Sequence, residues 1–203
     1  SIDVFAADEI SMADGATTTA FDSAGIRYYA QGGTLTLGSI DSGSGNVSLY
    51  ARTGITDSGT GDVDVTASTL RIQTETGQAG GAGQSGNHLE TRVAILSADV
   101  DSGGLFLTER NTLKVGQTAE IVVNRVKADG TVTDSSVSDA AQSDLSSEGA
   151  IVLQTTDGSI ETLATGSINS SAGNVLLQAQ EAEEETGSDI SIGANITVTD
   201  GHL

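Results

Sequence analysis

The sequence predicts an all-β fold, a single-domain parallel β-helix (β-solenoid) spanning residues 1–203. One short pattern recurs along the chain: a glycine, a variable residue, and then two apolar residues separated by one position. Such repetition is typical of stacked architectures, in which each unit buries its apolar side chains only against its neighbours. Because only 3% of the residues are aromatic, we expect a narrow core filled by aliphatic side chains. Copies of the pattern begin at Gly33, Gly45, Gly61, Gly103, Gly149 and Gly173.

The first thirty residues alternate apolar and polar side chains, as half-buried strands do. Strands are expected at residues 2–6, 9–12 and 26–30. We expect the aromatic rings of this region to cover an open end of the stack, and the alternative is a platform on which a carbohydrate ring stacks. These rings belong to Phe5, Phe21, Tyr28 and Tyr29.

A second short strand is expected soon after each copy of the pattern. Val47 is followed eight residues later by Ile55, and Val63 is followed seven residues later by Leu70. Two strands of about five residues with polar turns between them give a coil of about 20 residues. The chain would then form about ten coils, with glycine supplying the backbone freedom that tight corners need.

Three segments interrupt the pattern and are expected as insertions between coils. They lie near residues 77–87, which are rich in glycine, near 135–148, which are rich in Ser, Asp and Ala, and near 179–188. The segment 135–148 is expected as a short helix or a protruding loop. The alternative fold is a pair of tandem antiparallel sandwiches with a boundary near residues 116–130.

Composition and charge narrow the functional classes. The formal net charge of −20 argues against binding to nucleic acid or to an anionic membrane. Residues 128–203 hold seven Asp and six Glu but no basic residue. There is no Cys, and no apolar run reaches the roughly 18 residues of a transmembrane segment. The richness in Ser, Thr, Gly and Asp favours an extracellular or cell-surface location, with any export signal outside these residues.

One region resembles a known family of surface proteins. The residues Leu89-Glu90-Thr91-Arg92-Val93, the strand Gly103-Gly104-Leu105-Phe106-Leu107 and Leu113-Lys114-Val115-Gly116 are similar to the repeats of filamentous-haemagglutinin-like large exoproteins and giant bacterial surface adhesins. The similarity extends over about residues 33–116 and 149–179. It implies a right-handed parallel β-helix at the cell surface that acts as a stalk, adhesin or matrix fibre. The secretion domain of that family, with its Asn-Pro signature, is absent, because the chain contains no Pro.

The sequence carries no motif of a catalytic nucleophile or of a paired-histidine metal site. The two histidines, His88 and His202, are expected at the surface, and we expect the chain not to be an enzyme. The enzymatic alternative is a polysaccharide-active β-helix, which needs carboxylates beside basic residues on neighbouring coils. Asp62 or Asp64 near Arg71 and Arg92 are the candidates for such a cleft.

Turn aspartates supply the one candidate metal site. Hard oxygen ligands suit Ca²⁺, and in-register coils could bring aspartates from successive turns together. The candidate ligands are Asp41, Asp57, Asp62 and Asp101. The alternative is that these side chains only close Asp-Ser-Gly turns. No other cofactor is expected.

The expected function is structural. We expect an extracellular β-solenoid segment or subunit of a surface filament, stalk or biofilm matrix, whose partners are copies of itself or neighbouring segments of a longer chain stacked end to end. The alternative is an adhesin module that binds a surface glycan or host receptor through inserted loops such as residues 77–87.

Overall fold

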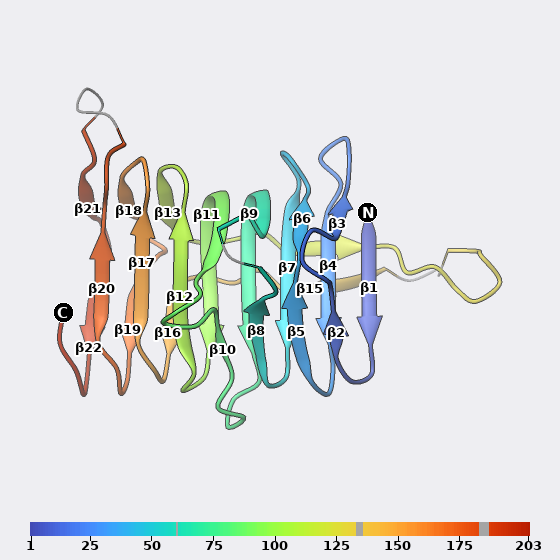
Figure 1. Cartoon of the computed structure of the whole chain (residues 1–203), viewed down its shortest axis with the longest axis horizontal. Helices are drawn as coiled ribbons and strands as arrows, with labels where there is room; N and C mark the ends of the chain where they lie inside the picture. Colours follow the sequence, from blue (N-terminus) through green and yellow to red (C-terminus); the bar gives the residue numbers. More distant parts are fainter. Residues whose placement is uncertain (60, 133–135, 183–186) are drawn as a thin grey trace.

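The computed structural model describes residues 1–59, 61–132, 136–182 and 187–203, and these residues form an all-β solenoid (Figure 1). They contain twenty strands in one continuous parallel sheet and two strands in a separate antiparallel pair. No helix occurs in these four ranges. The predicted fold class is therefore confirmed: the chain winds in successive coils, and each strand pairs with the corresponding strand of the coils before and after it.

Each coil contributes strands to three faces, which run along the rod. The first is the lateral face, in which each strand pairs with the next one along the rod. In order along the rod, it consists of β1 (Ile2–Ala6), β4 (Ile26–Ala30), β7 (Asn46–Ala51), the second halves of β9 (Val65–Thr74) and β11 (Leu89–Val100), β16 (Leu145–Ser147), β19 (Ile168–Ser170) and β22 (Ile196–Val198).

The other two faces complete each coil. The second consists of β2 (Ile10–Ser11), β5 (Thr34–Leu37), β8 (Gly54–Asp57), β10 (Gly81–Ala82), β12 (Gly104–Glu109), β17 (Ile151–Thr155) and β20 (Val175–Gln178). The third consists of β3 (Thr17–Thr19), β6 (Ser39–Asp41), the first halves of β9 and β11, β13 (Leu113–Val115), β18 (Ile160–Thr162) and β21 (Ile190–Ile192). The faces shift at β11, where the first residues of the strand pair with the end of β12 and Ile95 and Leu96 pair with β13.

Stacked aliphatic side chains fill the core, as the scarcity of aromatic residues predicts. On the lateral face one inward column runs through eight coils: Val4, Tyr28, Leu49, Ile72, Ala98, Leu145, Ile168 and Ile196. Leu49, Ile72, Leu145 and Ile168 have no exposed surface. Full burial of such a side chain contributes about 1.5–3 kcal/mol, so the repeated column is a major source of stability.

The expected number of about ten coils is wrong, because the coils are longer than 20 residues. Successive members of the inward column lie 24, 21, 23, 26, 47, 23 and 28 residues apart. Longer corners account for most of this excess, and the spacing of 47 contains the antiparallel pair. Eight coils at about 4.8 Å each give a stack roughly 35 Å long.

The glycine-rich segment 77–87 lies partly within the stack, unlike the insertion expected there. It contains β10, where Ala82 pairs with Ile55 of the coil before and with Leu105 of the coil after. A Cβ on Gly81 would lie 2.5 Å from backbone atoms of Gly103 and Gly104, so a larger residue does not fit between these coils. Exposed turns lie on both sides of β10, at residues 76–79 and 84–87.

The largest departure from the stack, which we call the excursion, covers residues 117–132 and 136–144. It contains the antiparallel pair β14 (Ile121–Val123) and β15 (Val137–Asp139). The insertion expected near 135–148 therefore begins much earlier and ends at β16, and its described part contains no helix. Residues 133–135 lie outside the described set, as do residues 183–186 of the insertion expected near 179–188.

The excursion folds back over the lateral face toward the first coils. Arg27 Nε donates to Asp139 Oδ2 at 3.0 Å, and Ser48 Oγ donates to the same oxygen at 2.6 Å. Gln142 donates to the carbonyl of Ile72 at 3.0 Å, and Ser97 and Thr118 share a hydrogen bond of 2.8 Å. These contacts attach the excursion to the lateral face over several coils.

Candidate functional site

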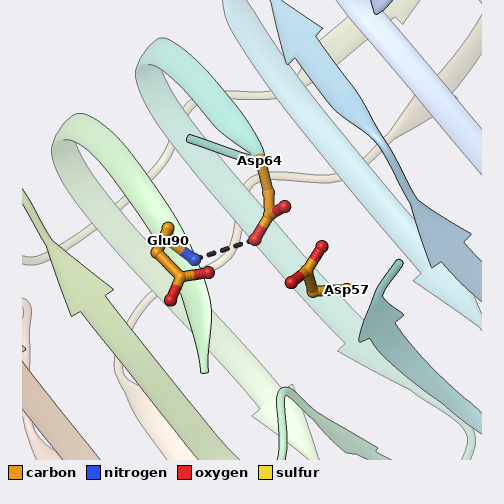
Figure 2. A group of neighbouring side chains, drawn as sticks. All are labelled: Asp57, Asp64 and Glu90. Atoms are coloured by element: carbon orange, nitrogen blue, oxygen red, sulfur yellow. Dashed lines mark hydrogen bonds between the residues drawn. The ribbon is translucent and has the colours of Figure 1, made fainter. Parts of the chain in front are cut away.

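Three carboxylates from two neighbouring coils meet at one corner of the solenoid. One oxygen from each of Asp57, Asp64 and Glu90 lies within 4.8 Å of the others. Figure 2 shows that the carboxylates of Asp57 and Asp64 face one another, with Glu90 beside them. We call this group the carboxylate cluster. Within the described ranges no other group of three His, Cys, Asp or Glu side chains comes this close together.

Local backbone structure places each of the three side chains. Asp57 ends β8, and its Oδ1 accepts a 2.8 Å hydrogen bond from the amide of Gly59, which closes the turn that follows. Asp64 directly precedes β9, and Glu90 is the second residue of β11. Because β9 and β11 pair in register, the Glu90 amide donates to Asp64 Oδ2 at 2.8 Å. Asn87 Nδ2 donates to Asp57 Oδ2 at 3.1 Å from the turn of the glycine-rich segment.

Burial raises the pKa of two carboxyl groups in the cluster. Asp64 is only 3% exposed, and burial, followed by its hydrogen bond with Asp57, raises its pKa to about 9. Burial also raises the pKa of Glu90, and the nearby charge of Asp57 adds to that effect. Glu90 Oε2 is buried and accepts no hydrogen bond from the described residues. At neutral pH the Asp64 carboxyl is therefore protonated and donates to Asp57.

This arrangement can hold a proton or a divalent cation, but not both at once. A shared proton removes the repulsion between two adjacent carboxylates. A cation such as Ca²⁺ prefers six to eight oxygen ligands, of which the cluster supplies a part. Binding it would displace the proton from Asp64, so occupancy would rise with pH.

The four aspartates expected to bind calcium do not form a common group in the structure. Asp57 lies in the carboxylate cluster, and Asp62 lines the adjoining hollow of about 410 Å³ together with Asp57 and Asp64. Asp41 is exposed and accepts a 2.8 Å hydrogen bond from the amide of Gly43, as in an ordinary Asx turn. Calcium binding itself stays a prediction.

Asp101 has a structural role at another corner. Its side chain is buried and accepts a 2.7 Å hydrogen bond from the amide of Ala79. Burial favours the neutral acid, but backbone amides, including those of Ser102 and Ala79, outweigh burial and hold its pKa below the usual value. Asp101 thus joins the glycine-rich segment to the end of β11.

Sequence reasoning named two members of the cluster, Asp57 as a calcium ligand and Asp64 as a carboxylate of an enzyme cleft, but it missed Glu90. The signal that could have found it is register. Arg92 pairs with Thr66 of the coil before. Counting back two residues on each strand places Glu90 beside Asp64. Arg92 is exposed, and Arg71 is buried and donates to the carbonyl of Ala140 in the excursion.

A second buried acid lies at the corner between β12 and β13. Glu109 has no exposed surface, and burial raises its pKa to about 7. Its Oε2 accepts hydrogen bonds from the Thr91 hydroxyl at 2.8 Å and the Val93 amide at 2.9 Å. Its Oε1 accepts from the amide of Asn111 at 3.0 Å. Glu109 therefore joins neighbouring coils.

The aromatic residues near the N-terminus form an outward ladder, and the expected covering of an open end is not observed. The rings of Phe5, Tyr29 and Tyr50 stack along the lateral face, with centroid separations of 5.9 and 4.2 Å. Tyr28 is in the core, and Phe21 is 76% exposed at a corner. Since the ladder rings use their faces to stack on one another, those faces are not free to receive a sugar ring.

Both histidines form hydrogen bonds within the chain. His88 is half-buried, shares a 2.9 Å hydrogen bond with Thr108, and has its pKa lowered by burial. His202 is exposed, and its carbonyl accepts a 2.8 Å hydrogen bond from the amide of Val175. Neither contact brings a carboxylate to the ring.

No model of a protein family, no curated protein and no solved structure matches this chain. The resemblance to exoprotein repeats therefore stays a prediction. The described residues include no helix that is long and apolar enough to span a membrane.

Proposed function

We propose that this chain is a structural element of an extracellular filament, stalk or matrix, in which β-solenoids stack end to end. The observation that carries the proposal is the state of the two ends. Within the described residues, β1, β2 and β3 each pair on one edge only, and so do β21 and β22 at the other end. Free strand edges are ready to pair with another strand in the same direction.

The side chains at both ends support this proposal. Ile2, Val4, Ile10 and Met12 at the first coil, and Ile196 and Val198 at the last, are only partly buried against the core. Ile190 and Ile192 of the last coil are 42% and 58% exposed. Apolar side chains at both ends would be covered if a second solenoid continued the core.

Stacking of this kind joins unlike ends. A head-to-tail contact that does not close into a ring produces an open filament. The composition, rich in Ser, Thr, Gly and Asp and with a net charge of −20, suits a soluble surface exposed to the extracellular medium.

Electron microscopy and light scattering of the 203-residue chain test the proposal. We expect rods of variable length whose mean length grows with protein concentration and with salt, because salt screens the repulsion between acidic chains. A particle that stays a single short rod at every concentration and ionic strength, with calcium present or absent, would contradict end-to-end stacking.

A further inference from the structure

The excursion carries a hairpin that reaches beyond the N-terminal end of the stack. This hairpin, residues 124–132, is called the arm. Figure 1 shows it in yellow, extending past β1 along the direction of the rod. The amide of Asn124 donates to Ser1 Oγ at 3.2 Å, so the arm starts level with the first coil.

The arm begins on the outer side of the lateral face. Arg125 Nε lies 2.7 Å from Asp3 Oδ2, and its guanidinium lies 4.6 Å from the centre of the Phe5 ring. Residues 126–129 then lead outward, and the amide of Gly130 donates to the carbonyl of Lys127 to close the turn. Three extended residues cover about 10 Å, which is roughly the height of two coils.

Solvent surrounds the apolar side chains of the arm. Val126 and Val132 pair across it, and they are 63% and 50% exposed. Two exposed valines on a projecting hairpin have no partner surface among the described residues, and covering them would be favourable.

The distribution of charged residues along the chain indicates which surface the arm can contact. Arg125 and Lys127 are two of only eight basic residues, whereas residues 128–203 contain none. The first coil, residues 1–25, holds five acidic residues and no basic one. An acidic end meeting an acidic half would repel. Arg125 is paired with Asp3 of its own coil, so Lys127, near the arm's one acidic residue Asp129, is the basic residue that the arm carries beyond the first coil.

The lateral face of the last two coils continues the track on which the arm already lies. Phe5 and Tyr29 occupy the same outward column as Asn169 and Thr197, through registered pairs on every coil between them. At the first coil Arg125 lies over the Phe5 ring of this column, while Asp139 and Ala140 of the excursion contact the neighbouring outward column of Arg27, Ser48 and Arg71. At the last coils it borders a hollow of about 520 Å³, whose lining includes Asn169, Thr197 and the acidic Asp99 and Glu148.

We propose that the arm docks on a second copy of this chain, over the outward column of Asn169 and Thr197, and so fixes the register of end-to-end stacking. This inference rests on the stacking proposed above. When the first coil of one copy follows the last coil of another, the arm lies over roughly two coils of that copy. Lys127 then lies near coils whose charged residues are all acidic, and the two valines of the arm leave solvent.

Disulfide trapping tests the docking directly, because the chain contains no Cys. Ala128→Cys in the arm combined with Thr197→Cys is expected to give disulfide-linked oligomers under mild oxidation. The matched control combines Ala128→Cys with Ser191→Cys, an exposed residue of the same last coil on the third face. Equal cross-linking in both variants, or none with Thr197→Cys in solutions that contain assemblies, overturns the inference.

An arm variant separates this inference from the stacking proposal. Val126→Asp combined with Lys127→Glu is expected to raise the concentration needed for assembly at least about tenfold. Its circular dichroism and melting temperature should match those of the natural chain, since the arm lies outside the stack. If the variant assembles as well as the natural chain, the arm inference is wrong but stacking stands. If the natural chain never assembles, stacking itself is wrong.

Discussion

Arg27 Nε lies 3.0 Å from Asp139 Oδ2, although 112 residues separate the two in the chain. The side chains are only 5% and 10% exposed, and Arg27 also contacts Asp3 at 3.0 Å. A buried guanidinium between two carboxylates thus fastens the excursion to the first coils. Removing one member of a buried charge group leaves the other without compensation.

Asp139→Asn is therefore expected to release the excursion from the lateral face and to lower the free energy of unfolding by about 3 kcal/mol. Limited proteolysis should cut within residues 117–144 faster than in the natural chain, and thermal unfolding should report the loss of stability. The matched control is Glu161→Gln, which removes an exposed pair with Lys114. It should cost about 0–1 kcal/mol. Equal effects of the two variants would contradict the role assigned to Asp139.

The carboxylate cluster predicts that stability falls as pH rises. The folded-state pKa of Asp64 is about 9, well above the ordinary value of 3.8, so the folded chain binds this proton more tightly than the unfolded chain. Stability is then lost progressively from about pH 4 to about pH 9. Burial raises the pKa of Glu109 from its ordinary value of 4.5 to about 7, so Glu109 also lowers stability as pH rises from about 4.5 to about 7. Melting temperature measured across this range should decrease toward high pH.

Asp64→Asn tests the origin of this pH dependence. An amide has the shape of the protonated acid, can donate to Asp57 and can accept from the Glu90 amide, but it does not ionise. The variant should melt close to the natural chain at pH 5 and above it at pH 9. Asp62→Asn, which alters an exposed carboxylate two residues away, should leave the slope unchanged. The slope should shrink to the part that Glu109 produces, and an Asp64→Asn chain with the full slope of the natural chain would contradict the role assigned to Asp64.

The fold was readable from the sequence because the repeat encodes it directly. Gly45 to Ala51 forms a strand of a coil as expected, and Val47 is fully buried. The copy at Gly61 is not its equivalent, because Val47 pairs with Leu70, and Val63 lies before the continuous strand β9. The coil length was misjudged, because it depends on corner residues that carry no apolar signal. The antiparallel pair was missed as a unit, since β14 and β15 meet only through folding of the excursion onto the lateral face.

The candidate site was less predictable than the fold. Asp41 and Asp57 both accept hydrogen bonds from amides two residues later, as in ordinary turns. An aspartate at a corner of the solenoid is therefore no evidence of a ligand-binding site. The cluster instead depends on Glu90 lying beside Asp64, which requires the register of β9 against β11. Register across a corner is set by packing of the whole coil, and one copy of a repeat does not encode it.

Close approach between coils predicts which glycines are required. A Cβ on Gly81 would lie 2.5 Å from backbone atoms of the next coil, whereas a Cβ on Gly86 would have no atom within 4 Å. Gly81→Ala should therefore force the coils apart and cost about 1–3 kcal/mol, and Gly86→Ala should be nearly neutral. Chemical denaturation of both variants measures the difference. A neutral Gly81→Ala would contradict the tight contact between these coils.

The position of a coil in the stack predicts whether a core substitution affects stability or assembly. Leu49 is fully buried in the middle of the inward column, so Leu49→Ala leaves a cavity and should cost about 2–5 kcal/mol of stability. Ile196 belongs to the last coil and is only partly buried. Ile196→Ala should cost less stability in the isolated rod but should weaken end-to-end assembly, because the next copy would cover this side chain. Thermal unfolding at low protein concentration measures the effect on stability, and light scattering at high concentration measures the effect on assembly. An Ile196→Ala chain that assembles normally would show that the last coil is not a joining surface.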